Sequence, residues 1–299
     1  MTINSLISQE DIKAINKSRS SSQTTPLELD SLLATAEAQL TEMHIYDAAV
    51  DLIRTPDGHI LWGSGRIPLV IQSAHQRFVL KPYDVYNPTE EKRILKVVQG
   101  KLAPIVLYFG NGFYAEELID LEKAKTLESI ADSGDLRHAV IKGAEIYSEL
   151  ARLGINYNHR HWLDEFHLVG DNVRITDFGT STFFRKANSS EDFSERVRYV
   201  VDNGVGRYVD EFRPIPVFAP DRPKYEETKV VMAGLSENAE TAVNLLYVLM
   251  TGIIGIKDYI ERAGWKIGVD PRAWDRAMEI FPLFVKSFAN SYKAAQPPK

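Results

Sequence analysis

The spacing of the apolar residues changes along the chain, and this change limits the folds that are open to it. Upstream of residue 120, apolar residues come in short runs bounded by turn residues, as is typical of β-strands. The predicted strands are residues 60–62, 69–72, 78–81, 104–109 and 113–119, with a helix at 89–99. Downstream of residue 135 the period is mostly helical, with apolar helices predicted at 138–153 and 239–251. Strands followed by helices predict a mixed α+β architecture.

The composition bounds the class of protein. With 299 residues, of which 44% are apolar, the chain can bury a sizeable core. A net charge of −6 argues against nucleic acid or an anionic membrane as a partner, because such surfaces need a basic excess. No window approaches the roughly 18 consecutive apolar residues of a membrane span, and the first dozen residues lack a secretory signal. Since there is also no cysteine, we expect a cytoplasmic protein.

A polar stretch divides the N-terminal region. Residues 17–26 consist of serine, threonine, glutamine, basic residues and one proline, so they predict a linker after a short N-terminal segment. Leucines and alanines at helical spacing over residues 27–43 then predict an amphipathic helix. We therefore expect residues 1–26 to form a terminal segment and linker, 27–119 a helix with a β-rich lobe, and 120–299 a helical lobe.

The most informative stretch of the chain runs over residues 154–179 and ends in Thr176, Asp177, Phe178 and Gly179. The aspartate is predicted to follow a strand directly, with a glycine two residues on. Other residues of the stretch offer metal-binding or proton-transfer chemistry: His159, His161, Asp164 and His167. Carboxylates are hard oxygen ligands that suit magnesium, and a neutral imidazole can accept a proton.

Residues 154–179 resemble, almost position for position, the catalytic loop and the Asp-Phe-Gly motif of protein kinases. The resemblance implies that Asp177 holds a magnesium ion against the phosphates of ATP. Asp164 stands where the family has a metal-binding asparagine, so it is implied as the second metal ligand. His159 stands in the place of the catalytic aspartate that accepts the proton of the substrate hydroxyl. His161 falls where the family has a lysine that contacts the transferred phosphate.

Upstream segments are similar to the nucleotide-binding lobe of the same family, and the resemblance covers roughly residues 58–285. Gly63, Ser64 and Gly65, followed by Val70, look like the glycine-rich turn of that lobe. Glycines let backbone amides approach phosphates without a side-chain clash. The resemblance therefore implies that this turn covers the phosphates of ATP.

The lysine and glutamate of the small lobe also have counterparts. Lys81 is similar to the strand lysine that contacts the first two phosphates. Glu91 looks like the helix glutamate that pairs with that lysine, and Glu90 is the alternative partner. Glu116 or Glu117, together with Leu118, falls where the family connects its lobes and contacts the adenine.

Taken together, the resemblance implies a bilobal protein kinase-like fold. A small antiparallel β-sheet lobe with one helix would be joined to a larger, mainly helical lobe that contains the catalytic loop and the activation segment. It also implies ATP and Mg²⁺ as ligands, and a protein as substrate or partner.

The replacement of the catalytic aspartate by His159 leaves three functions open. An atypical phosphotransferase, similar to serine/threonine kinases, is favoured by the retained Lys81, Glu91, Asp164 and Asp177, because phosphoryl transfer depends mostly on positioning and charge neutralisation. A pseudokinase that acts as a scaffold or allosteric partner is favoured by the loss of the base. Transfer of the adenylyl group of ATP is the third hypothesis.

Two further interpretations concern the histidines. His159, His161 and His167 lie in one window with Asp164, which also allows a zinc site. Alternating histidines on a strand would put both rings on one face, but the flanking pattern of a known zinc enzyme is missing and the Asp-Phe-Gly run would be unexplained. In the other interpretation, these histidines only satisfy buried hydrogen bonds beside Trp162.

Overall fold

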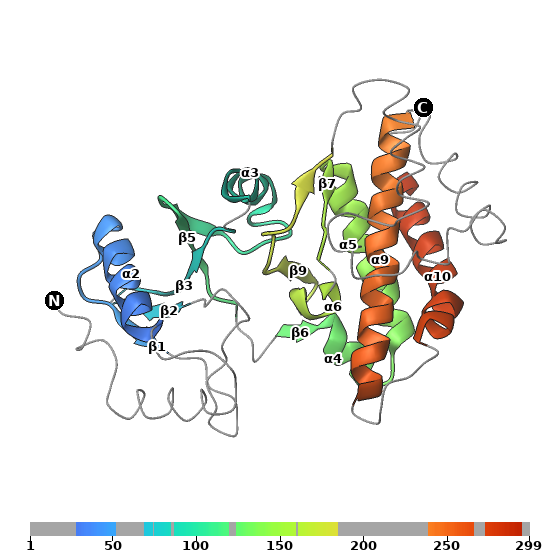
Figure 1. Cartoon of the computed structure of the whole chain (residues 1–299), viewed down its shortest axis with the longest axis horizontal. Helices are drawn as coiled ribbons and strands as arrows, with labels where there is room; N and C mark the ends of the chain where they lie inside the picture. Colours follow the sequence, from blue (N-terminus) through green and yellow to red (C-terminus); the bar gives the residue numbers. More distant parts are fainter. Residues whose placement is uncertain are drawn as a thin grey trace. The chain divides into compact units, whose positions relative to one another are not determined.

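The computed structural model describes residues 28–51, 69–73, 75–84, 87–119, 124–159, 161–184, 239–265 and 273–294. The chain divides into two units, Met1–Asp120 and Leu121–Lys299. Both helices and antiparallel sheets are present, so the predicted α+β class is confirmed (Figure 1). Three predictions lie outside the described residues and stay predictions: the linker at 17–26, the strand at 60–62, and the glycine-rich turn at Gly63, Ser64 and Gly65.

The first unit contains a five-stranded antiparallel sheet with the strand order β1-β2-β3-β5-β4. Its strands are β1 (Ala49–Asp51), β2 (Leu69–Gln72), β3 (Arg77–Pro82), β4 (Val106–Phe109) and β5 (Phe113–Glu117). Four of them confirm predicted strands, to within a few residues at their ends. The central strands are rich in β-branched and aromatic residues, and Ile71 and Phe78 are completely buried in them.

The described residues of the first unit include the helices α2 (Glu28–Glu42) and α3 (Pro88–Val98), and both confirm predicted helices. Helix α3 begins at Pro88, whose fixed φ suits the first helical position. Ile94, Leu95 and Val98 recur at helical spacing and are buried, so they form the face by which α3 joins the core.

The second unit is mainly helical. Its helices are α4 (Leu127–Asp132), α5 (Leu136–Arg152), α6 (Trp162–Glu165), α9 (Ala239–Trp265) and α10 (Ala273–Ala294). Helices α5, α9 and α10 pack against one another (Figure 1). The predicted helices at 138–153 and 239–251 are confirmed, although α9 continues to Trp265 with buried Ile256 and Ile260. None of the helices in the described part of the chain combines the length with the apolar character that a bilayer span needs.

Two small antiparallel sheets accompany these helices. One has the order β6-β8-β9 and the other pairs β7 with β10. Their strands are β6 (Ala124–Thr126), β7 (Ile155–Asn156), β8 (Phe166–Val169), β9 (Asn172–Ile175) and β10 (Thr182–Phe183). Except for the strand before Asp177, they were not predicted, because runs of two to four residues are too short to show a period.

Aromatic side chains fill the core of the second unit. The ring of Trp162 is fully buried and lies near those of Tyr147 and Phe284, with centroids 5.6 Å and 6.0 Å away. Its indole nitrogen donates to the carbonyl oxygen of Gly252 in α9 at 3.2 Å, and its ring lies against Gly143 in α5. Trp162 therefore anchors the short helix α6 to α5 and α9.

Replacing Gly143 by alanine tests this anchor. Alanine is the better helix former by about 1 kcal/mol, but its Cβ would overlap the ring of Trp162. Overpacking usually costs about 1–3 kcal/mol, and this overlap is severe, so after the gain in helix propensity we expect Gly143→Ala to lower the free energy of unfolding by about 1–2 kcal/mol. Urea denaturation measures this. The exposed Arg137→Ala, also in α5, should change stability by no more than about 0.5 kcal/mol. A Gly143→Ala variant as stable as the wild type would contradict the packing.

Candidate functional site

The hairpin of β8 and β9 brings two polar residues together. The strands pair antiparallel with Phe166 opposite Ile175, so Glu165 before β8 lies opposite Thr176 after β9. The amide of Thr176 donates to the carbonyl oxygen of Glu165 at 3.3 Å, and its hydroxyl donates to the Glu165 carboxylate. The next residue is Asp177. The predicted strand before Asp177 is confirmed, and the strand pairing places a second carboxylate near it.

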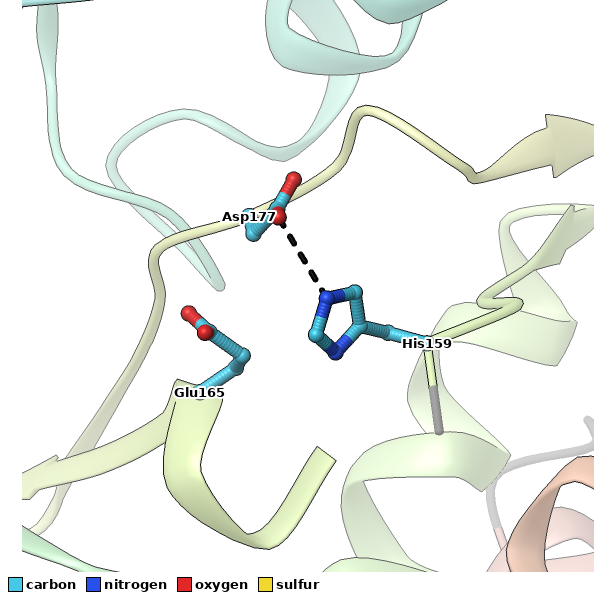
Figure 2. Close-up of side chains that lie close together, drawn as sticks. All are labelled: His159, Glu165 and Asp177. Atoms are coloured by element: carbon cyan, nitrogen blue, oxygen red, sulfur yellow. Dashed lines mark ion pairs between the residues drawn. The ribbon is translucent and has the colours of Figure 1, made fainter. Parts of the chain in front are cut away.

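His159, Glu165 and Asp177 form one group in which the nearest nitrogen and oxygen atoms all lie within 4.8 Å of one another (Figure 2). His159 Nε2 lies 3.4 Å from Asp177 Oδ2, and the other carboxylate oxygen, Oδ1, accepts from the amide of Gly179 at 2.8 Å. The side chain of Asp177 is 35% exposed and that of His159 is 18% exposed. A small ion can therefore reach the group from solvent.

Hydrogen bonds fix the loop that presents His159. Asn158 Nδ2 donates to the carbonyl oxygen of Thr180 at 3.3 Å, and the Thr180 hydroxyl donates back to the carbonyl oxygen of Asn158 at 3.2 Å. This exchange ties the loop after β7 to the turn that follows Asp177. It is the local reason that His159 and Asp177 face each other.

The ring of Tyr157 packs against His159 and against the aromatic residues that follow Glu165 and Asp177. Its centroid lies 6.1 Å from that of His159, 5.1 Å from Phe166, which follows Glu165, and 5.7 Å from Phe178, which follows Asp177. Tyr157 is fully buried, and its hydroxyl has no hydrogen-bond partner among the described residues. Tyr157 therefore contributes hydrophobic packing beside the group.

The charges around His159 counteract the effect of burial on the pKa of its imidazole. Burial alone would lower the pKa of the imidazole, because it disfavours the charged form. The hydrogen bond to Asp177 and the charge of Asp177 raise the pKa, and the charges of Glu165 and Asp164 add to this. The pKa of His159 is consequently raised above its usual value. A protonated His159 offsets part of the negative charge of the two carboxylates.

Asp164 binds a different partner from the one that the sequence suggested. Its carboxylate accepts from both terminal nitrogens of Arg262, at 2.9 Å and 3.3 Å. Arg262 also contacts Glu128 at 2.9 Å and Asp258 at 3.1 Å. Burial, followed by the hydrogen bond with Asp164 and its charge, raises the pKa of Glu128 to about 7, although Arg262 opposes the shift. The acid that the structure places beside Asp177 is Glu165, the residue after Asp164.

Sequence reasoning missed Glu165, although a signal for it exists. Gly170 has a positive φ of 62° in the turn between β8 and β9. Counting outward from a hairpin turn at Gly170 and Asp171 pairs Glu165 with Thr176, as the strand register does. A turn read at Gly170 would therefore have pointed to Glu165.

The three histidines of the window have separate partners. His161 Nδ1 lies 2.9 Å from Asp258 Oδ2, and His167 Nε2 lies 3.4 Å from the hydroxyl of Thr176. Neither His159 nor His161 lies in a strand, because β7 ends at Asn156 and His161 is the N-cap of α6. Among the described residues, the metal-competent group includes His159 alone of the three. The geometry gives no support to the three-histidine zinc site.

In the first unit, Lys81 forms an ion pair with the buried Glu116. Glu116 in β5 lies opposite Val79 in β3, two residues from Lys81, so the two side chains are diagonal neighbours on one face of the sheet. The predicted pairing of Lys81 with Glu91, or with Glu90, stays a prediction.

The remaining residues that the sequence suggested for nucleotide binding lie in or beside the same sheet. Glu91 is buried in α3, and its carboxylate accepts from the backbone amide of Asp84. Val70 is buried in β2, and Leu118 is partly exposed just after β5. Their contacts with a nucleotide stay predictions.

Comparison with known proteins adds no assignment, because no family model matches the chain and no curated protein matches it. What the second unit offers chemically is an imidazole grouped with two carboxylates at a partly exposed position. Such a group can hold a divalent cation or share a proton.

A pair of substitutions tests the role of Tyr157. Tyr157→Phe keeps the ring and removes a buried hydroxyl without a partner among the described residues, so stability should stay the same or rise by about 1 kcal/mol. Tyr157→Ala removes the ring and should cost about 3–5 kcal/mol. Urea denaturation distinguishes the two. A clear loss of stability in Tyr157→Phe would mean that the hydroxyl is bound after all.

The raised pKa of His159 predicts a pH-dependent contribution to stability. Because the folded state holds the proton more tightly, the stabilisation is complete below the unfolded pKa of about 6.5 and is lost as pH rises through the folded pKa. The difference in unfolding free energy between the wild type and His159→Gln should therefore be larger at about pH 6 than at about pH 9. Denaturation in EDTA measures it, with the exposed His138→Gln as control. Equal differences at both pH values would refute the prediction.

Proposed function

We propose that this protein binds ATP with a divalent metal ion and acts as an atypical phosphotransferase with a bilobal, protein kinase-like fold. The observation that carries the proposal is the convergence of His159, Glu165 and Asp177 at an Asp-Phe-Gly motif that begins two residues after strand β9. A five-stranded antiparallel sheet with helix α3 in the first unit, and a mainly helical second unit, support it. The proposal changes the assignment of the metal ligands, because Glu165 takes the role suggested for Asp164.

The donor atoms of the site fit a divalent ion. Two carboxylates supply the hard oxygen ligands that Mg²⁺ and Mn²⁺ prefer. Glu165 is held by the hydroxyl of Thr176 and Asp177 by the amide of Gly179. Ligands oriented in this way by their neighbours are typical of metal sites. A bound ion would neutralise charge on the phosphates of ATP.

In the first unit, Lys81 is the proposed contact to the phosphates. A flexible lysine loses side-chain entropy when it is ordered, and the ion pair with Glu116 restricts it in advance. Glu116 thus orients the lysine, in addition to its suggested place near the adenine. Glu91 is assigned a structural role at its bond to the Asp84 amide, which fixes the chain between β3 and α3.

A strong base is not required for this chemistry, because the transition state of phosphoryl transfer is loose. His159 stands in the position of the base. His161 pairs with Asp258 in α9, so we assign it to the attachment of α6 and not to the phosphate.

A specific contact favours the second candidate, a pseudokinase that acts as a scaffold or allosteric partner. The imidazole of His159 lies 3.4 Å from Asp177 and, when protonated, neutralises part of the charge that a metal ion would otherwise balance. In this alternative the group is an internal ion pair, and the output of the protein is a binding surface.

Labelled ATP distinguishes these functions. The full-length protein is incubated with casein as a generic acceptor and either γ-labelled or α-labelled ATP, with Mg²⁺ or Mn²⁺. We expect transfer of the γ label, reduced by at least about 10-fold in Asp177→Asn and in Glu165→Gln. Two exposed carboxamide variants serve as matched controls, Asp171→Asn in the β8–β9 turn and Glu279→Gln in α10, and they should keep wild-type transfer.

The other outcomes of this experiment are equally decisive. Transfer of the α label alone would identify adenylyl transfer, and thermal stabilisation by ATP without transfer would identify the pseudokinase. If the protein neither transfers label nor is stabilised by ATP, the proposal of a nucleotide site is wrong.

A further inference from the structure

The imidazole of His159 lies in the same small group as the carboxylates of Glu165 and Asp177 (Figure 2). We propose that His159 is itself a metal ligand, and that the site therefore selects a first-row transition ion such as Mn²⁺ over Mg²⁺. The inference rests on the proposed function for the role of the ion, since ATP phosphates would supply its remaining ligands.

The distances suit three ligands of one ion. With bonds of about 2.1 Å, two ligand atoms at a tetrahedral angle are about 3.4 Å apart, and opposite ligands are about 4.2 Å apart. His159 Nε2 and Asp177 Oδ2 are 3.4 Å apart, and all three ligand atoms lie within 4.8 Å of one another. Small side-chain rotations are enough to close the group around an ion.

The orientation of the imidazole suits a metal ligand. His159 Nε2 faces Asp177, and its Nδ1 is buried with no hydrogen-bond partner in the described part of the chain. The nitrogen that faces Asp177 is thus the one that an ion at this place would meet. The imidazole ring packs against Tyr157. The two carboxylates accept hydrogen bonds from the hydroxyl of Thr176 and the amide of Gly179.

The mixed donor set determines which ion fits. Mg²⁺ takes oxygen ligands almost entirely and gives up its waters reluctantly. Imidazole nitrogen suits transition ions, while carboxylates suit Mn²⁺ as well as Mg²⁺. One nitrogen with two carboxylate oxygens therefore adds affinity for Mn²⁺ and adds little for Mg²⁺.

Binding of the metal alone tests the inference. The EDTA-treated, full-length protein is titrated with Mn²⁺ while the electron paramagnetic resonance signal of free Mn²⁺ is followed, and Mg²⁺ is added as a competitor. We expect the wild type to bind Mn²⁺ at least about 10-fold more tightly than Mg²⁺, and His159→Gln to lose about 10- to 100-fold of the Mn²⁺ affinity only. Glu165→Gln should weaken both ions, and His138→Gln neither.

A second measurement needs no variant, which matters if His159→Gln does not fold. Mn²⁺ bound to the wild type should show the electron spin echo modulation of a directly bonded imidazole ¹⁴N nucleus. Absence of that modulation, equal affinity of the wild type for both ions, or an unchanged affinity ratio in a folded His159→Gln would each overturn the inference.

The results also separate this inference from the proposed function. A protein that binds Mn²⁺ through His159 but is neither stabilised by ATP nor able to transfer label would overturn the proposed function and support the metal site. A protein that transfers the γ label while binding both ions equally would support the proposed function and overturn the inference.

Discussion

The antiparallel pairing of β8 with β9 is the constraint on which the candidate site depends. A hairpin fixes which residues face each other at its open end, and here Phe166 pairs with Ile175, so Glu165 meets Thr176 and lies close to Asp177. A shift of the register by one residue would turn the side chains to the opposite face. The position of both carboxylates therefore follows from backbone hydrogen bonds and not from attraction between the side chains, which carry like charge.

Two neighbouring acids of α6 have different partners because of helix geometry. Successive residues of a helix are rotated by about 100°, so Asp164 and Glu165 cannot share one partner. Asp164 is held by Arg262 of α9, which also binds Glu128 of α4. This charge cluster joins three helices of the second unit, and it leaves Glu165 to face Asp177. Arg262 offsets part of the charge of Asp164, while Glu165 and Asp177 supply the two carboxylates of the group at His159.

The group is packed against aromatic side chains on one side and is partly exposed to solvent on another. Tyr157 contacts the rings of His159, Phe166 and Phe178, so His159 touches the aromatic core itself, and Glu165 and Asp177 each directly precede a residue of that core. Asp177 stays about one-third exposed. A binding site needs this combination, because fixed ligands lose little entropy when an ion binds, while an open face lets the ion enter.

By itself, the sequence determined the α+β class, helix α3 with its apolar face, and the place of Asp177 after a strand, because these features repeat over a few neighbouring residues. Only the tertiary structure decided the partners of the polar side chains. It paired Lys81 with Glu116 across the sheet, and Asp164 with Arg262, which lies 98 residues away. Spacing along a chain carries local periodicity, but contacts between distant segments depend on how strands pair and helices pack. Glu165 rather than Asp164 therefore lies beside Asp177.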